Sequence, residues 1–450
     1  MKLAEVFEEE YYSNEHQKTI EELISNARSE NLNIRVIKQL FLKPYLPANE
    51  ICRHFGIGKS DLEKTFDFIR SYKKSKVFFA YSPYPYLVNV LGNLSKDAQR
   101  TLTILRGKKP NPLSDTLELF ISESCNAKCK FCYRGDNVYP HRDKVLSTSE
   151  FEQLINDFAD LNGQNLVITG GLEPLLSHSL LDILKTGIER KLNVNLYTNG
   201  IALGEDNSIT EQIMKIPKVR VSLNASNREN YKEILGVDKF AQVTENLRQL
   251  VETKGKNKSN VRIGVSFAIF KQNYACIPEA IELAQKLELD FLDLRAVEVF
   301  TGERLDQQQR QELKSILTEV RRKKMQNEYG ALDVSVADTF NEVINPETDC
   351  MKYVKGELIK ELWHFRVTVT PYGKVYALNL IGQPLREDNR FLLGKLGKNN
   401  RLAKILTNDK KIPYDRNCLL AHDMTLIMAL SKLDSDLKFG IDLEKNPFNW

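Results

Sequence analysis

The sequence predicts an α/β protein built on a partial, TIM-like (β/α)6 barrel, and three observations lead to this prediction. The 450 residues are 42% hydrophobic and 28% charged, an ordinary globular balance with room for two or three domains. Six short apolar runs recur along the middle of the chain, separated by stretches of helical periodicity. Such alternation is typical of parallel βα units. Because a closed barrel needs eight strands, six indicate a partial barrel or a doubly wound sheet.

Three domains are predicted. Residues 1–112 are expected to be helical up to a loop rich in Gly and Pro, with apolar residues at helical spacing in 20–27, 34–41 and 62–69. The barrel is expected in residues 113–325, with its strands at 117–121, 166–169, 194–197, 219–223, 263–269 and 291–294. Residues 326–450 are expected to form a small α+β domain around a β-hairpin that turns at Pro371-Tyr372-Gly373.

Composition and charge exclude several classes of protein. No stretch approaches the roughly 18 apolar residues of a membrane helix, and the acidic N-terminus lacks the layout of a secretory signal. A net charge of +4 is too small to indicate a nucleic-acid partner. The seven cysteines, an odd number, do not form a disulfide framework. We therefore expect a cytoplasmic protein with reduced thiols and with no membrane partner.

Three of the cysteines, Cys125, Cys129 and Cys132, fall within eight residues directly after the first predicted strand. Ligands bind at the carboxyl ends of such strands, so the three thiolates can converge on one metal centre. A structural zinc site with His141 as a fourth ligand and three incidental core cysteines are the alternatives. An iron–sulfur cluster normally takes four cysteines, so three would leave one iron with an open position for chemistry.

Polar groups also follow the next strands of the predicted sheet. Paired glycines at a strand end let a ligand approach the backbone, and an acid beside them can accept a hydrogen bond from a cationic group. Each such group is ordinary by itself, but their succession along one edge of the sheet indicates a binding site. The residues concerned are Gly170, Gly171, Glu173, Asn199, Ser222, Asn224 and Arg295.

The motif Cys-x3-Cys-x-Phe-Cys after strand one, followed by Gly-Gly-x-Glu-Pro after strand two, resembles the radical S-adenosylmethionine (SAM) superfamily. The resemblance covers residues 113–325 and implies that Cys125, Cys129 and Cys132 hold a [4Fe–4S] cluster, whose fourth iron SAM chelates. It places Phe131 against the adenine and Gly170, Gly171 and Glu173 at the SAM amino group. Asn199 also belongs to the expected SAM site, and Ser222 and Asn224 fall near the ribose or carboxylate. Leu172 interrupts the usual Gly-Gly-Glu-Pro, which puts the backbone donor in doubt.

The resemblance also implies an activity. Such enzymes cleave SAM reductively and abstract hydrogen from a substrate, here expected to be a peptide or a small metabolite. A low-potential electron donor of the flavodoxin or ferredoxin type would be a partner. Arg295 would pair with a substrate or SAM carboxylate, or with an acid on the rim. Cys276 is expected in the core rather than as a thiol donor. The fate of the substrate radical stays open.

The C-terminal hairpin is similar to the SPASM and twitch domains of radical SAM enzymes, which usually hold auxiliary clusters. Leu378 stands where those domains carry a cysteine just after the hairpin. Only Cys350 and Cys418 remain, with His364 and His422 as conceivable partners. Two thiols do not make a conventional cluster site, so we expect a degenerate SPASM-like domain without clusters.

The N-terminal region has the pattern of a helix–turn–helix or winged helix, with a turn at residues 56–58 and a capping box formed by Ser60 and Glu63. Residues 51–112 carry 12 basic and 4 acidic groups. A plain helical domain, a peptide-recognition module and a nucleic-acid-binding module are all compatible with this pattern.

Two other functions compete with the radical SAM hypothesis. One is a zinc-binding, nucleic-acid-binding protein in which the cysteine cluster is structural. The other keeps the radical SAM fold as a non-catalytic binding module.

Overall fold

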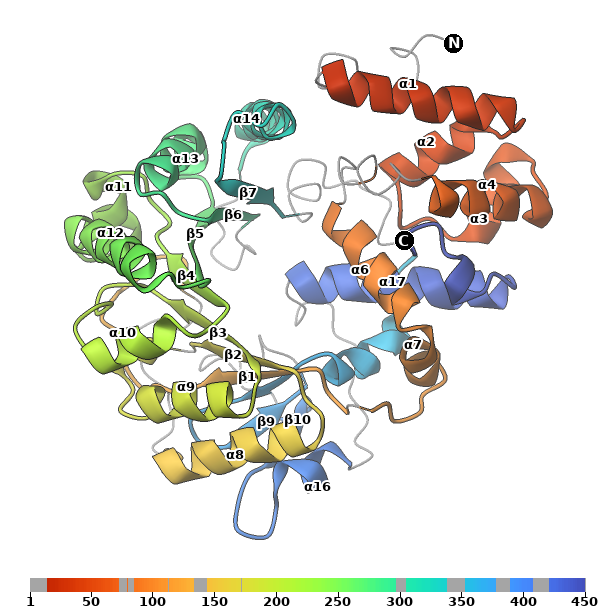
Figure 1. Ribbon diagram of the computed structural model, residues 1–450. Helices are drawn as coiled ribbons and strands as arrows, with labels where there is room; N and C mark the ends of the chain where they lie inside the picture. Colours follow the sequence, from red (N-terminus) through yellow and green to blue (C-terminus); the bar gives the residue numbers. More distant parts are fainter. Residues whose placement is uncertain are drawn as a thin grey trace.

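A single curved sheet organises the computed structural model, which describes residues 14–72, 79, 85–111, 113–132, 144–170, 172–296, 305–337, 353–377, 389–407 and 421–449 (Figure 1). The sheet has ten strands in the order β10-β9-β8-β1-β2-β3-β4-β5-β6-β7. Neighbouring strands from β1 to β7 are parallel, and the two ends of the sheet do not pair with each other. The predicted fold class, an α/β partial barrel, is therefore confirmed.

All six predicted strands are present, each within two residues of its expected bounds. They are β1 (Thr116–Phe120), β2 (Asn165–Thr169), β3 (Asn193–Thr198), β4 (Lys218–Ser222), β5 (Arg262–Ile269) and β6 (Phe291–Ala296). The prediction of six was one too few, because β7 (Asp333–Val336) adds a seventh parallel strand beyond residue 325. This strand is only four residues long and has polar residues at alternate positions, so its apolar signal is weak.

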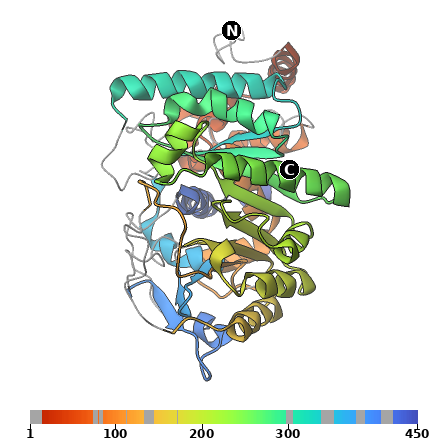
Figure 2. The same cartoon turned by 90° about the vertical axis from the view of Figure 1, so that its left-hand side faces the viewer.

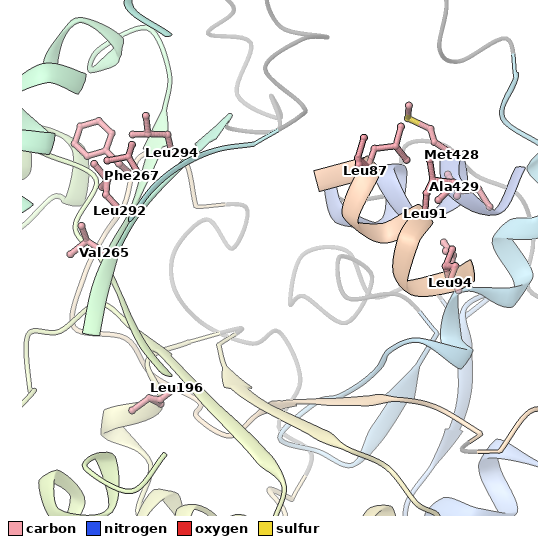
Figure 3. Close-up of a cluster of buried hydrophobic side chains, with 14 of the residues drawn as sticks. Leu87, Leu91, Leu94, Leu196, Val265, Phe267, Leu292, Leu294, Met428 and Ala429 are labelled. Carbon is pink, nitrogen blue, oxygen red and sulfur yellow. The ribbon is translucent and has the colours of Figure 1, made fainter. Parts of the chain in front are cut away.

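Helices cover the outer face of the sheet (Figures 1 and 2). Strand residues that point toward them are apolar and fully or almost fully buried, among them Leu196, Val265, Phe267, Leu292 and Leu294 (Figure 3). Side chains alternate between the faces of a strand, so the residues between these point to the inner, concave face. The covering helices are α8 (Thr148–Asp160), α9 (Leu180–Glu189), α10 (Asn207–Ile213), α11 (Arg228–Leu235), α12 (Phe240–Asn257), α13 (Ile277–Lys286) and α14 (Gln307–Met325).

The C-terminal hairpin continues the barrel sheet. Strand β8 (Val367–Val369) pairs in parallel with β1, with Leu117 opposite Val367. Strands β9 (Lys374–Tyr376) and β10 (Leu392–Lys395) follow in antiparallel order. The sheet therefore runs across the domain boundary predicted at residue 325, and the hairpin is part of the barrel rather than an appendage. Strand pairing between residues about 250 apart leaves no local trace in the sequence.

The last part of the chain packs against the N-terminal helices. Helix α17 (Ala421–Lys438) contacts α6 (Pro85–Lys96), α3 (Ala48–Phe55) and the 3₁₀ helix η6 (Gly356–His364) (Figure 1). Leu87 and Leu91 of α6 lie beside Met428 and Ala429 of α17 (Figure 3). The short helix η9 (Leu443–Lys445) packs against α6 and α4 (Lys59–Ser71). The two ends of the chain thus share one apolar core.

The N-terminal helix–turn–helix pattern is present as α3 and α4, with Gly56 in the left-handed conformation (φ 63°) between them. The predicted capping box is wrong, because α4 begins directly after Gly58 and Ser60 already lies inside its first turn. Within residues 14–111, as far as they are described, the structure contains helices and no strand that could be the wing of a winged helix. The other helices there are α1 (Asn14–Ser29), α2 (Ile34–Leu42) and α7 (Ala98–Leu105).

In the described part of the chain, none of the helices combines the length and the apolar character that crossing a bilayer demands.

Candidate functional site

The three clustered cysteines lie on the loop after β1, residues 121–132, which we call the cysteine loop. None of the three cysteines forms a disulfide, and all three are partly exposed. Two backbone N–H groups of the loop, those of Lys128 and Lys130, donate to the carbonyls of Leu235 and Ile234 at the end of α11 (2.8 and 2.9 Å). Gly236 follows this helix with φ 68°, and a Cβ there would lie 2.6 Å from the Lys128 carbonyl oxygen. Glycine is therefore needed for the helix end to approach the loop.

Glu173 lies buried against the cysteine loop. Its backbone N–H donates to the carbonyl of Ser124 (2.9 Å). Its carboxylate accepts hydrogen bonds from the Thr198 hydroxyl and from the backbone N–H groups of Asn199 (2.7 Å) and Leu175 (3.0 Å). These bonds take up most of the acceptor capacity of a carboxylate. Glu173 thus connects β2, β3 and the cysteine loop through its own hydrogen bonds.

Asn199, at the end of β3, completes this network. Its side-chain N–H2 group donates to the side-chain oxygen of Asn126 (2.6 Å) and lies 3.8 Å from the sulfur of Cys125. Its side-chain oxygen accepts from the backbone N–H of Ile201 (2.9 Å). Asn199 therefore fixes the position of the cysteine loop relative to β3.

The turn after β2 is tight. The carbonyl oxygen of Leu172 lies only 1.5 Å from the position that a Cβ of residue 170 would take, so Gly170 tolerates no side chain. Gly171 lies outside the described residues. Leu172 is buried against Tyr372 and partly buried Cys125, so the residue that interrupts the family motif contributes packing beside the cysteines.

Tyr372 is a site residue that sequence reasoning missed. It lies in the turn between β8 and β9, and its hydroxyl donates to the Glu123 carboxylate in the cysteine loop (2.9 Å). Nothing local in the sequence distinguishes an aromatic residue in a hairpin turn, so only the pairing of β8 with β1 reveals the contact.

Ser222 and Asn224 lie at the end of β4, where the Asn224 side chain makes hydrogen bonds to β4 and β5. The Asn224 side-chain oxygen accepts from the backbone N–H of Ala268 on β5 (2.8 Å), and its N–H2 group donates to the Ser222 carbonyl (3.3 Å). Asn224 has φ 56°, a left-handed conformation that asparagine adopts more readily than most residues. Asn224 therefore joins β4 to β5, whereas Ser222 is partly exposed beside it.

Of the remaining predicted site residues, Phe131 belongs to the cysteine loop itself and Arg295 lies on β6. Phe131 packs its ring 5.4 Å from that of Phe270. Arg295 is exposed on the inner side of β6, since it alternates with the outward-facing Leu294. The thiol of Cys276 accepts a hydrogen bond from the Asn230 side chain (3.0 Å).

Several residues named for metal binding fall outside the cysteine loop. His364 is buried, and its Nδ1 lies 2.8 Å from the Leu113 carbonyl oxygen. The residues His141, Cys350, Leu378 and Cys418 and the side chain of His422 lie outside the described part of the structure.

Tyr231 is a second residue that the sequence did not reveal. It is fully buried on α11, and its hydroxyl has no hydrogen-bond partner among the residues described. Burial, with the nearby Cys129, Glu173 and Cys125, raises the pKa of this hydroxyl well above its usual value. A neutral, unpaired O–H donor therefore lies near the cysteine sulfurs.

The side chains present fit an iron–sulfur cluster. No three His, Cys, Asp or Glu side chains of the described residues are gathered as ligands of a single metal ion. A [4Fe–4S] cluster binds each cysteine through a different iron, so its ligands need not converge on one point. Three cysteines on one loop, none of them in a disulfide, provide the donors, and the Tyr231 hydroxyl has no hydrogen-bond partner among the described residues.

Comparison with known proteins identifies the central region. Residues 119–284 match the family model of the radical SAM superfamily, a span that starts within β1 and ends within α13. The chain has a radical SAM domain. All three clustered cysteines, Glu173, Asn199 and Asn224 lie inside it. A [4Fe–4S] cluster and SAM are the characteristic cofactors of this superfamily.

Relatives of the radical SAM domain cover only part of the chain. A GTP 3',8-cyclase from Clostridium perfringens is 28% identical over 189 residues, which are 41% of this chain and 56% of the relative. A probable GTP 3',8-cyclase from Saccharolobus islandicus is 29% identical over 195 residues, 41% of this chain and 58% of the relative. The chain thus spans a little over half the length of the curated relatives it matches.

One solved structure with the same fold is Streptococcus suis SuiB bound to the precursor peptide SuiA. It has a TM-score of 0.51 and 16% sequence identity, and the match covers 70% of this chain and 69% of that chain. The likeness concerns the fold, an open α/β barrel.

Proposed function

We propose that this protein is a radical SAM enzyme in which Cys125, Cys129 and Cys132 hold a [4Fe–4S] cluster. One observation carries the proposal: three partly exposed cysteines, none of them in a disulfide, lie on one loop that Glu173 and Asn199 bind at the carboxyl edge of a radical SAM barrel. When bound, a low-potential cluster of this kind supplies the electron that cleaves SAM, and the family uses the resulting 5'-deoxyadenosyl radical to abstract hydrogen.

Different residues of the chain would bind the cluster and SAM. The cysteine loop provides the thiolates, and α11 and Asn199 hold that loop in place. Gly170, Gly171 and the backbone around Glu173 would bind the SAM amino group, since Gly170 lets a ligand approach the main chain. Phe131 would stack on the adenine. Ser222, which is partly exposed, would contact the ribose or carboxylate, with Asn224 orienting the strand end.

For the substrate we infer only a chemical class, and for the partner protein only that it donates electrons. The relatives named GTP 3',8-cyclase favour a small metabolite, and SuiB, which was solved with a precursor peptide, favours a peptide. Both classes remain within the proposal. An electron donor of the flavodoxin or ferredoxin type would deliver the electron.

Anaerobic reconstitution tests the proposal. We expect the full chain to take up iron and sulfide and to form 5'-deoxyadenosine from SAM under a strong reductant. Replacing all three clustered cysteines by alanine should abolish both results, because the cluster then has no thiolate donors. Cys276→Ala is the matched control, since this cysteine is partly exposed and lies outside the loop; it should keep its iron.

Two outcomes would contradict the proposal. Protein that stays free of iron after reconstitution would refute the cluster, and zinc in place of iron would favour a structural site. Protein that holds the cluster and binds SAM, but never forms 5'-deoxyadenosine, would be a binding module with the radical SAM fold.

A further inference from the structure

The inner face of the barrel is charged. Barrel interiors are commonly filled by branched apolar side chains. Here the inner positions of β4, β6 and β7 instead carry charged and polar residues, and the Asp293 carboxylate lies close to Lys218, Arg220 and Ser335. The residues are Lys218 and Arg220 on β4, Asp293 and Arg295 on β6, and Ser335 on β7.

Arg220 is the residue in this group that lacks adequate partners. Its side chain is only 11% exposed, and its Nε is buried without a hydrogen-bond partner. The nearest carboxylate of the described residues, that of Asp293, is 3.8 Å from the guanidinium, which is too far for a hydrogen bond. The guanidinium lies 3.5 Å from the centre of the Tyr197 ring, and this cation–π contact orients its plane.

Asp293 cannot neutralise all the positive charge around it. The Ser335 hydroxyl donates to one of its oxygens (2.8 Å), and the Lys218 ammonium lies 3.5 Å from the other, which also faces Arg220. Burial, followed by the positive charge of nearby Arg295, lowers the pKa of Arg220 to about 10. Asp293 therefore lies among three cations, and the one further carboxylate that acts on Arg220 among the described residues, that of Glu118 on β1, is itself 3.5 Å from Arg366.

A buried cation without hydrogen bonds is costly for a folded protein. The cost falls when an anion enters, because a guanidinium binds carboxylates and phosphates through two parallel hydrogen bonds. We propose that Arg220, together with Arg295, binds a carboxylate or phosphate group of the substrate inside the barrel. Calling this group part of the substrate rests on the proposed radical SAM activity, whereas the anion site itself does not.

Arg220 lies deeper in the barrel than the residues proposed to bind SAM, whereas Arg295, paired with Ala268 beyond the level of Ser222, lies at the strand end between the two. SAM also carries a carboxylate, but the residues proposed to bind it lie at the ends of the strands. Arg220 precedes Ser222 on β4 by two residues, which places it roughly 6–7 Å deeper in the barrel. An anion that binds Arg220 at this depth therefore belongs to the substrate and not to SAM.

Anion binding to the full reconstituted chain tests the inference. Calorimetric titrations with pyrophosphate and with succinate probe phosphate and carboxylate separately. We expect at least one of them to bind, and Arg220→Met to weaken that binding by about 10- to 100-fold, because charge-assisted hydrogen bonds are lost. Arg220→Lys should bind with intermediate affinity, since it keeps the charge without the planar fork.

Arg262→Gln is the matched control. Arg262 lies on the neighbouring strand β5, but it is exposed and paired with Asp333 (3.2 Å). This variant should bind the probe like the wild type. The melting temperature of Arg220→Met should equal or exceed that of the wild type, because an unpaired buried charge has been removed.

Four results would overturn the inference. They are no binding of either probe to the wild type, equal binding to Arg220→Met, equal weakening in Arg262→Gln, and a lower melting temperature of Arg220→Met with unchanged anion affinity. A selective loss of SAM affinity in Arg220→Met would assign the anion to SAM instead of the substrate. Anion binding that depends on Arg220 in a protein unable to cleave SAM would support the site while refuting the proposed enzyme.

Discussion

At the residue scale, single side chains connect the cysteine loop to elements far away in the sequence. Glu173 reaches β3 through Thr198 and Asn199, and Tyr231 presents its hydroxyl from α11. Tyr231 differs from Glu173 because its polar atom has no partner among the described residues. A buried hydroxyl without a hydrogen bond costs free energy, which a sulfur acceptor on a bound cluster would recover.

Tyr231→Phe tests the role of this hydroxyl in the protein without the cluster and in the protein with it. In the cluster-free protein, the variant should be as stable as the wild type or more stable by up to about 1 kcal/mol, because an unpaired hydroxyl is removed. In the reconstituted protein, the cluster potential should become more negative, since hydrogen bonds to sulfur stabilise the reduced cluster. Urea unfolding and an EPR-monitored redox titration measure the two effects.

Tyr274→Phe is the control, because its hydroxyl bonds to Glu312 on α14 rather than lying near the cysteines. Equal cluster potentials in wild type and Tyr231→Phe would show that this hydroxyl does not contact the cluster.

At the element scale, a buried ion pair attaches α17 to α3. The Lys432 ammonium donates to Asp436 one turn later, and both side chains are almost completely buried. The other Asp436 oxygen accepts from the backbone N–H of Ala48 at the start of α3 (2.7 Å). Asp436 therefore caps a helix nearly 400 residues away, and this cap depends on a paired charge.

Lys432→Met should destabilise the protein by about 3–5 kcal/mol, because Asp436 is left as an unpaired buried charge. Lys438→Met should cost at most about 1 kcal/mol, since Lys438 is exposed and its partner Asp434 keeps an ion pair with Lys355. Urea unfolding of both variants gives the comparison. Similar losses in the two variants would contradict the role of the buried pair.

A partly buried carboxyl group, that of Asp115, lies at the junction of α7, η6 and β1. Asp115 precedes β1 and pairs with Arg100 (2.9 Å), yet burial raises the pKa of its carboxyl from 3.8 to about 6. Arg100 and His364 oppose this shift, whereas Asp97 adds to it. A pKa higher in the folded protein means that the contribution to stability is complete below about pH 4 and is lost as the pH rises through 6.

Asp115→Asn removes this titration. Between pH 4 and pH 7, the wild type should lose roughly 2–3 kcal/mol of unfolding free energy relative to the variant. Urea unfolding of both proteins across this pH range measures the difference, in which the other carboxyl groups cancel. A difference that stays constant with pH would refute a raised pKa for Asp115.

At the scale of the whole molecule, the C-terminal region packs against two separate parts of the protein. Its hairpin joins the barrel sheet and brings Tyr372 to the cysteine loop, and α17 packs with the N-terminal helices. The barrel, its hairpin and the helices are thereby parts of one structure. Changes in the hairpin turn should consequently affect the cysteines about 240 residues earlier.

Tyr372→Ala should lower stability by about 3–5 kcal/mol, because it leaves a cavity beside Leu172 and Cys125. The loosened loop should also release a reconstituted cluster faster to a chelator. Tyr372→Phe keeps the packing and loses the bond to Glu123, so it should cost only about 1 kcal/mol. Equal rates of iron release in Tyr372→Ala and wild type would contradict the coupling.

The sequence by itself determined the parallel strands β1 to β6, the cysteine motif and the polar residues at the strand ends. These are local properties, because alternation and spacing are readable over a few residues. The resemblance to the radical SAM superfamily rests on the same short segments.

Only the tertiary structure decided the rest. It paired β8 with β1, placed Tyr231 and Tyr372 beside the cysteine loop, and left Arg220 buried with little to neutralise it. Strand pairing, burial and charge balance depend on residues that are distant in the chain. Their energies arise from packing and desolvation in the folded molecule, which no local pattern contains.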